Sequence, residues 1–135
     1  MVSQMPSDIE TQKNKEKCQA LLKLSPKIRY VGIVNEFGRT LAGQLRKGVT
    51  PFFKVQEARN EFFVEATRNL LRRSFVYSIG ETEFTLTVNE KVIILILPAI
   101  IGSHLYYFTF DKGTSLQEVI EVKDTTKKLM VDKDI

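Results

Sequence analysis

The chain has 135 residues, of which 43% are hydrophobic and 27% are charged, and its formal net charge is +4. This length is typical of one domain that buries enough surface to fold without a disulfide or a metal ion. One cysteine and one histidine cannot form an intramolecular disulfide or a structural zinc site, and the sequence indicates no cofactor. The mild basic excess permits an anionic partner, but it does not indicate a nucleic-acid-binding protein.

Neither targeting nor membrane insertion is indicated. The first seventeen residues lack the apolar core of a signal peptide, and the longest apolar run, residues 92–101, has about half the length of a membrane-spanning helix. We therefore expect a cytoplasmic protein that does not contact a membrane. We expect residues 1–16 to be the frayed start of the first helix and residues 17–135 to form a single domain.

The N-terminal half predicts a helix, a β-hairpin and a second, longer helix. A capping box of Ser7 and Glu10 opens the first helix, over about 8–23, and Pro26 ends it. β-Branched and aromatic residues predict strands over 28–35 and 39–45, joined by a turn at Gly38 and followed by a loop over 47–51. Apolar residues three or four positions apart predict the buried stripe of a helix over about 54–73: Val55, Ala58, Phe62, Ala66 and Leu70.

The C-terminal half predicts three strands and a terminal helix. Phe84, Leu86 and Val88 alternate with threonines, as in a half-buried strand. Residues 92–97 and 104–110 are apolar on both sides, which is typical of strands covered on both faces. Ser115 and Glu118 form a second capping box, which begins a helix that reaches about residue 130.

These elements follow in the order α-β-β-α-β-β-β-α and predict an α+β fold with a single five-stranded antiparallel sheet. Two strands that are apolar on both sides need helices on both faces of the sheet. We expect the long middle helix on one face and the two terminal helices on the other.

This order, and the residues at its joints, resemble a group of small, mostly archaeal, uncharacterised proteins. The similarity covers roughly residues 17–131 and is carried by glycines and strands, so it implies a fold and little chemistry. The matching segments are IRYVGIVN (28–35), GRTLAG (38–43), RKGVTP (46–51), Arg68-Asn69 and the strand and hairpin that follow Gly80.

The element order is also similar to that of the roadblock (dynein light chain) superfamily. That resemblance implies a homodimer that pairs the long middle helix and an edge strand, and a regulatory or scaffold role with a small GTPase. Profilin and PAS-type sensor domains share a five-stranded antiparallel sheet. The alternative is therefore a sensor that holds a small ligand or a peptide in a pocket lined by Phe62, Leu86 and Tyr106.

The sequence contains no recognisable set of catalytic residues, so we expect that the protein is not an enzyme. His104 has no adjacent pattern that would supply a nucleophile, and Cys18 is expected in the core of the first helix. Glu81 and Glu83 are expected on one side of a strand, as solvated acids. The segment from Gly38 to Gly43 lacks the lysine and hydroxyl residues of a phosphate loop.

The least ordinary feature is a group of four phenylalanines in twelve residues around the long helix, Phe52, Phe53, Phe62 and Phe63. Exposed aromatic residues at this density often mark a protein interface, and burial under the loop over 48–51 is the alternative. Two basic groups are also expected. Arg39, Arg46 and Lys47 lie at one end of the hairpin, and Arg68, Arg72 and Arg73 lie at the end of the long helix. We predict an interface that contains Phe53, Phe63, Arg59 and Arg68.

Overall fold

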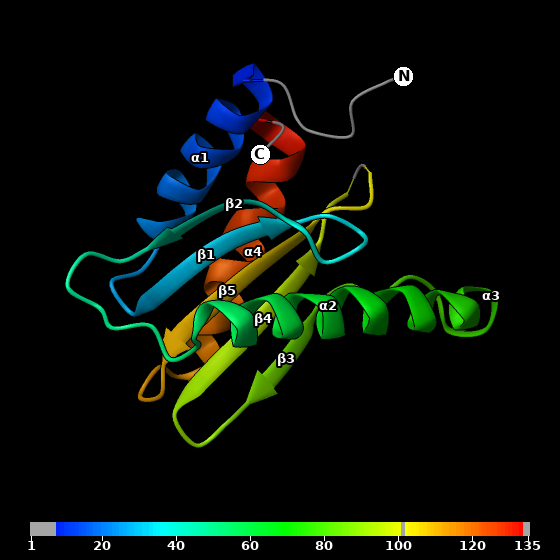
Figure 1. Ribbon diagram of the computed structural model, residues 1–135. Coiled ribbons are helices and arrows are strands. Elements are labelled where there is room, and N and C mark those ends of the chain that lie inside the picture. The colour runs from blue at the N-terminus through cyan, green and yellow to red at the C-terminus, as the bar shows by residue number, and fades with distance from the viewer. Residues whose placement is uncertain (1–7, 101, 134–135) are drawn as a thin grey trace.

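The computed structural model describes residues 8–100 and 102–133, which form an antiparallel sheet with helices on both faces (Figure 1). The predicted element order is confirmed, and a 3-10 turn and a short helix are added after the long helix; Ser7 lies outside the described residues. The elements are α1 (Asp8–Leu22), β1 (Ile28–Val34), β2 (Thr40–Leu45), α2 (Val55–Arg72), η1 (Arg73–Phe75), α3 (Val76–Ile79), β3 (Thr85–Val88), β4 (Val92–Pro98), β5 (Leu105–Asp111) and α4 (Leu116–Lys133).

The sheet has the strand order β2-β1-β5-β4-β3, and all of its pairs are antiparallel. The C-terminal strand β5 lies in the centre, where Tyr107 is opposite Gly32 of β1 and Ile96 of β4. Strands β4 and β5 are each buried at six successive positions. This confirms the prediction that they are covered on both faces.

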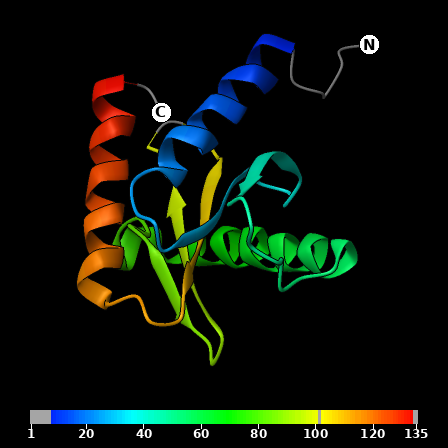
Figure 2. The same ribbon diagram turned by 90° about the vertical axis from the view of Figure 1, so that its left-hand side faces the viewer.

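Figure 2 shows the three layers, with α1 and α4 on one face of the sheet and α2 on the other. The first face carries the larger apolar cluster, in which Cys18 and Leu21 of α1 and Val119 of α4 meet β-strand residues such as Phe108. The second face carries a smaller cluster, whose buried members are Val34, Phe62, Ala66, Val92, Ile94, Ile96, Leu105 and Tyr107. One helix therefore covers a face by itself, while two helices share the other.

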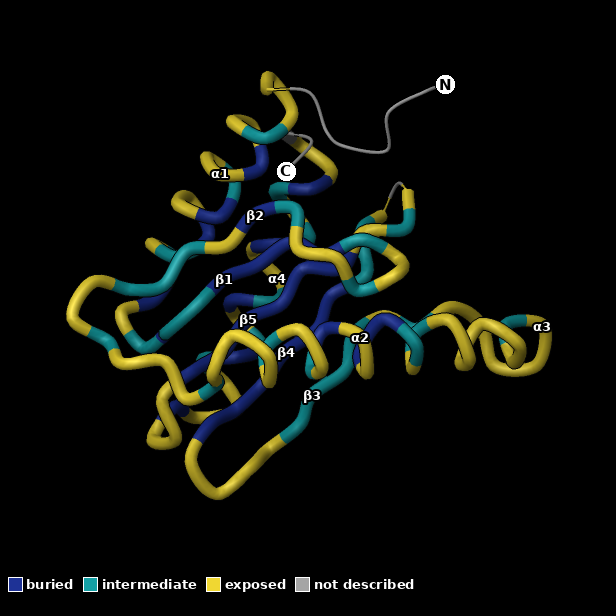
Figure 3. The backbone as a smooth tube through the Cα atoms, in the orientation of Figure 1, coloured by how far each residue is buried: buried dark blue, intermediate teal, exposed yellow. Residues whose placement is uncertain are grey.

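The cover that α2 provides is incomplete. Within α2, only Phe62, Glu65 and Ala66 are buried, so the prediction that Val55 and Leu70 lie in the core is wrong. The eighteen-residue helix is about 27 Å long, and only its middle turns lie on the sheet. Its C-terminal half and α3 project beyond β3 (Figure 1), where Figure 3 shows the backbone as mostly exposed.

The turn between β1 and β2 packs directly on α2. The Asn35 side-chain oxygen accepts hydrogen bonds from the N–H groups of Phe37 and Arg39, both at 2.9 Å, and this fixes the turn. Gly38 has a φ of 83°, and a Cβ atom there would lie 2.7 Å from the Cα of Phe63. Glycine is therefore required at this position both by the backbone angle and by the approach to α2.

The end of α4 that follows β5 is capped much as predicted. The Ser115 hydroxyl accepts a hydrogen bond from the Glu118 N–H at 3.2 Å, which is one half of a capping box. The Glu118 carboxylate in turn accepts a hydrogen bond from the Ser115 backbone and also binds the Lys27 ammonium at 2.9 Å. Within the described residues, no helix combines the length and the apolar character that crossing a membrane requires.

We predict that Gly38→Ala destabilises the protein by about 1–3 kcal/mol in urea unfolding, because the new Cβ meets α2 in a strained backbone conformation. Gly48→Ala is the matched control, since Gly48 has the same φ of 83° and no atom within 4 Å of its added Cβ. The control carries only the conformational cost. Equal losses of stability in the two variants would contradict the packing of the turn on α2.

Candidate protein-interaction surface

Exposed apolar side chains follow the outer side of α2 and continue past its end. Phe63 and Leu70 are seven residues apart, and Val64, Leu71 and Phe75 form a second line beside them, so both lines run along one side of the helix. Phe63 is 61% exposed and Leu71 is 64% exposed. We call these five residues the projecting face.

The projecting face continues into α3, where Tyr77 and Ile79 are also exposed. The Arg72 guanidinium lies 5.1 Å from the centre of the Phe75 ring, which gives the face a basic rim. Single exposed apolar residues are ordinary, but a continuous line of large ones with a basic rim is typical of a protein–protein interface.

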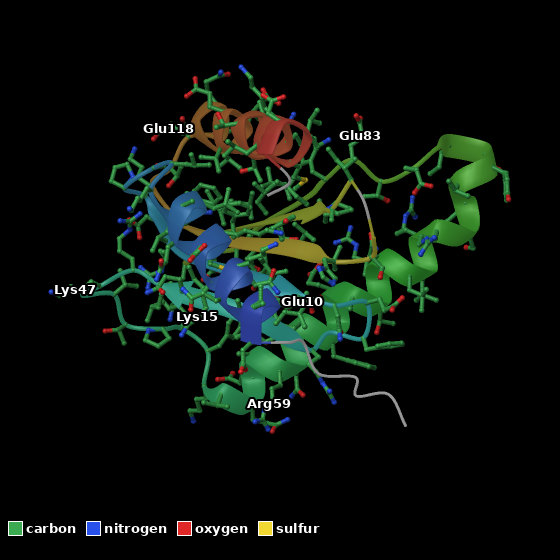
Figure 4. All side chains as sticks on the ribbon, turned by 90° about the horizontal axis from the view of Figure 1, so that it is seen from above. Glu10, Lys15, Lys47, Arg59, Glu83 and Glu118 are labelled. Carbon is green, nitrogen blue, oxygen red and sulfur yellow. The ribbon has the colours of Figure 1, made fainter. Side chains whose placement is uncertain are left out.

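The four residues predicted for the interface lie in three different places. Phe63 and Arg59, four residues apart on α2, are both exposed, and Figure 4 shows Arg59 pointing away from the body of the molecule. Arg68 is exposed and close enough to Glu65 to act on its charge. Phe53 precedes α2 and is half-buried in the wall of a pocket. The interface predicted from the sequence included neither Leu71, which was assigned to the buried stripe of the helix, nor Phe75, although their spacing from Val64 was available as a signal.

Two carboxylates of α2 are held close to the sheet. The Tyr107 hydroxyl donates a hydrogen bond to Glu61 at 2.8 Å. Burial raises the pKa of Glu61, and this hydrogen bond opposes the shift. Burial and the charge of Glu61 raise the pKa of Glu65, while Arg68 opposes this. Burial, followed by the negative charges of Glu61 and Glu65, raises the pKa of Tyr107 well above its usual value.

The raised pKa of Glu65 makes a pH-dependent contribution to stability. The folded state holds the proton more tightly than the unfolded state, so this contribution is lost as the pH rises from the ordinary value of 4.5 through the raised pKa. We predict that Glu65→Gln melts at a higher temperature than the wild type at pH 7, and that the difference shrinks towards pH 4.5.

The matched control for this pH series is Glu81→Gln, which removes the same charge from an exposed loop position. Its melting temperature should follow that of the wild type at every pH. If Glu65→Gln followed it too, the cost assigned to the buried carboxylate would be wrong.

A pocket of about 130 Å³ lies between the sheet and the N-terminal half of α2. Tyr30, Tyr107 and Thr109 reach it from the sheet, Ala58 and Phe62 from α2, and Phe52 and Phe53 from the preceding segment. The pocket predicted for a sensor was Phe62, Leu86 and Tyr106. Phe62 does line the observed pocket, but that trio is wrong because Leu86 and Tyr106 pack on the opposite face of the sheet.

The predicted basic cluster at one end of the first hairpin does not form. Arg39 precedes β2 and Arg46 follows it, so the strand separates them. The Arg46 guanidinium instead donates to backbone carbonyls of Leu22 at 2.6 Å, Ser25 at 2.7 Å and Ile28 at 2.6 Å. It thereby satisfies the C-terminal end of α1, while Lys47 points outward (Figure 4).

The remaining candidate residues give no constellation for catalysis. Cys18 is fully buried, and burial raises the pKa of its thiol to about 12. Glu81 and Glu83 precede β3 instead of sharing one of its sides, so that expectation is wrong, although both are exposed as expected. His104 is exposed at the rim of a groove of about 500 Å³ beside the end of α2. Among residues 8–100 and 102–133, no three His, Cys, Asp or Glu residues are placed to hold a metal ion.

The arrangement of the sheet and helices matches solved structures of MglB and Roadblock/LC7 proteins. A structure described as MglB with tetrameric arrangement aligns with a TM-score of 0.75 and 13% identity, over 96% of this chain and 93% of that chain. The gliding protein MglB from Thermus thermophilus gives 0.74 and 15% identity, over 95% and 93%. A Roadblock/LC7 domain from Streptomyces avermitilis gives 0.66 and 8% identity, over 87% and 93%.

No protein-family model and no curated protein matches the chain. At the identities of the structural neighbours, the similarity establishes the fold. The chain therefore has a roadblock-like fold, and the predicted fold class is confirmed.

Proposed function

We propose that the chain is a non-enzymatic regulatory or scaffold module of the cytoplasm, that it forms a homodimer, and that it acts with a small GTPase. The observation that carries this proposal is the projecting face. Its five apolar side chains run from Phe63 in the middle of α2 to Phe75 just past its end, and all of them are exposed.

A second copy of the chain suits the projecting face. Two α2 helices that pack antiparallel about a two-fold axis place Phe63 of each copy against the far end of the other, near Leu71 and Phe75. Such a contact is apolar on both sides and has a basic rim on each copy. A structural neighbour is described as an MglB with a tetrameric arrangement, which supports self-association as a property of this fold.

The proposal of a GTPase partner is based on the resemblance to the roadblock superfamily. The fold agrees with that resemblance. A regulatory role requires only a surface that binds the partner protein. The resemblance to small archaeal proteins stays a prediction.

We predict that Phe63→Asp yields a folded monomer. Phe63 is 61% exposed, so the charge costs little in the isolated chain but is desolvated in a dimer that buries this face. Sedimentation equilibrium and circular dichroism measure mass and folding on the same sample. At about 50 µM the wild type should be dimeric, and this dimer should weaken at least about tenfold in the variant, since a central interface residue contributes about 2 kcal/mol or more.

The matched control is Val131→Asp, because Val131 is a 70% exposed apolar residue on α4, on the other face of the sheet. This variant should keep the mass of the wild type. A Phe63→Asp chain that stayed dimeric, or that lost its fold, would count against the projecting face as the contact.

The partner is tested separately, with wild-type and Phe63→Asp protein immobilised in lysate from the native organism. We expect mass spectrometry to identify a small GTPase that is retained in a way that depends on whether GTP or GDP is added. Retention that is the same with either nucleotide, or the recovery of no GTPase, counts against this part of the proposal and leaves the dimer standing.

A further inference from the structure

The pocket under the N-terminal half of α2 has the size of a site for a single ring. Its volume is about 130 Å³. An engineered protein cavity of about 150 Å³ lined by apolar side chains binds benzene. The short side chain of Ala58, one turn before Phe62 on α2, helps to leave this space open.

Aromatic rings surround most of the pocket. The Tyr30 and Phe62 rings are nearly parallel, with centres 6.3 Å apart, and the Tyr107 ring meets Phe62 edge-on at 4.9 Å. Phe52 and Phe53 complete the wall. A further ring can pack against these faces and edges in the offset and edge-to-face geometries that aromatic side chains prefer.

The hydroxyl of Thr109, a residue in the wall of the pocket, has no hydrogen-bond partner among the described residues. Thr109 interrupts the apolar sequence of β5, is buried with 9% of its surface exposed, and lines the pocket. Every fully enclosed side-chain polar atom of the described residues has a hydrogen-bond partner, so the unpaired Thr109 hydroxyl is not fully enclosed, and Thr109 lines the pocket. A valine would fill almost the same space without a polar group to satisfy. The hydroxyl therefore points to a bound group that can form a hydrogen bond.

The mouth of the pocket favours an uncharged molecule. The Arg29 guanidinium is already engaged by the Asp111 carboxylate at 3.1 Å and by the Thr50 carbonyl at 2.8 Å, and it lies 4.2 Å from the centre of the Phe52 ring. Its positive charge is compensated, so it offers little extra attraction for a carboxylate ligand.

We propose that this pocket binds a small, uncharged, single-ring phenol. The ring lies among Tyr30, Phe62 and Tyr107, and the phenol hydroxyl forms a hydrogen bond with Thr109. The ligand is a free molecule, and its binding does not require the dimer or the GTPase.

The test titrates the full-length chain with phenol and with toluene, which has the same shape but no hydroxyl, and follows binding by calorimetry and by NMR shifts. Phenol should bind saturably at one site, shift the resonances of Tyr30 and Phe62, and bind about fivefold more tightly than toluene, as one net hydrogen bond allows. Phenol binding that is absent, or that shifts only residues outside the pocket, would overturn the proposal.

Thr109→Val separates the hydrogen bond from the shape of the pocket. The variant should bind phenol no better than toluene, and without ligand it should melt at a higher temperature than the wild type. Thr87→Val is the matched control, a strand threonine that does not line the pocket, and it should keep the preference for phenol. An unchanged preference in Thr109→Val contradicts the proposed contact.

Two further experiments test whether the ligand occupies the pocket and whether it is a free molecule or a side chain of a protein. Ala58→Leu should fill the pocket and abolish phenol binding. If this variant does not fold, Thr109→Val still tests whether phenol binds at this site. N-acetyl-tyrosinamide presents the same ring on a peptide backbone. If it binds in the pocket while phenol does not, the site takes a tyrosine side chain of a protein, and the proposal of a free ligand is wrong.

Discussion

The rest of the structure depends on two neighbouring strands that are apolar on both faces. Because β4 and β5 cannot leave either face in water, the chain must supply helices on both sides of the sheet. Two helices meet this need on one face, but α2 meets it alone on the other. A single helix laid across a sheet contacts it only through its middle turns. The projecting end of α2 and the pocket beneath its first turns both follow from this geometry.

Most of the fold could be predicted because its signals are local. The alternation in β3, the apolar runs of β4 and β5 and the three-to-four spacing in α2 each describe an element and one of its faces. The spacing could not show where α2 leaves the sheet, so Leu70 has the period of a core residue and is exposed. Neighbouring strand residues also point to opposite faces, which is why Tyr106 lies away from the pocket that Tyr107 lines.

The polar groups that are buried on the α2 side are where the structure departs from simple packing. Glu65 is held next to another carboxylate, and Thr109 has an unused hydroxyl in an apolar strand. Of the residues that the structure describes, Glu65 is the only charged one that is buried. Residues that lower the stability of a protein and are not needed to form its fold often belong to functional sites. Glu65 and Thr109 both lie on the face of the sheet that α2 covers.

The Arg46 guanidinium has a consequence for the way the molecule opens. It joins the residue after β2 to carbonyl groups at the end of α1 and at the start of β1, segments that lie up to 24 positions away in the sequence. Helix α1 cannot move off the sheet unless these hydrogen bonds break and the end of the hairpin is released with it. Backbone amides of α1 and of the end of the β1–β2 hairpin next to Arg46 should therefore exchange with solvent in one cooperative event.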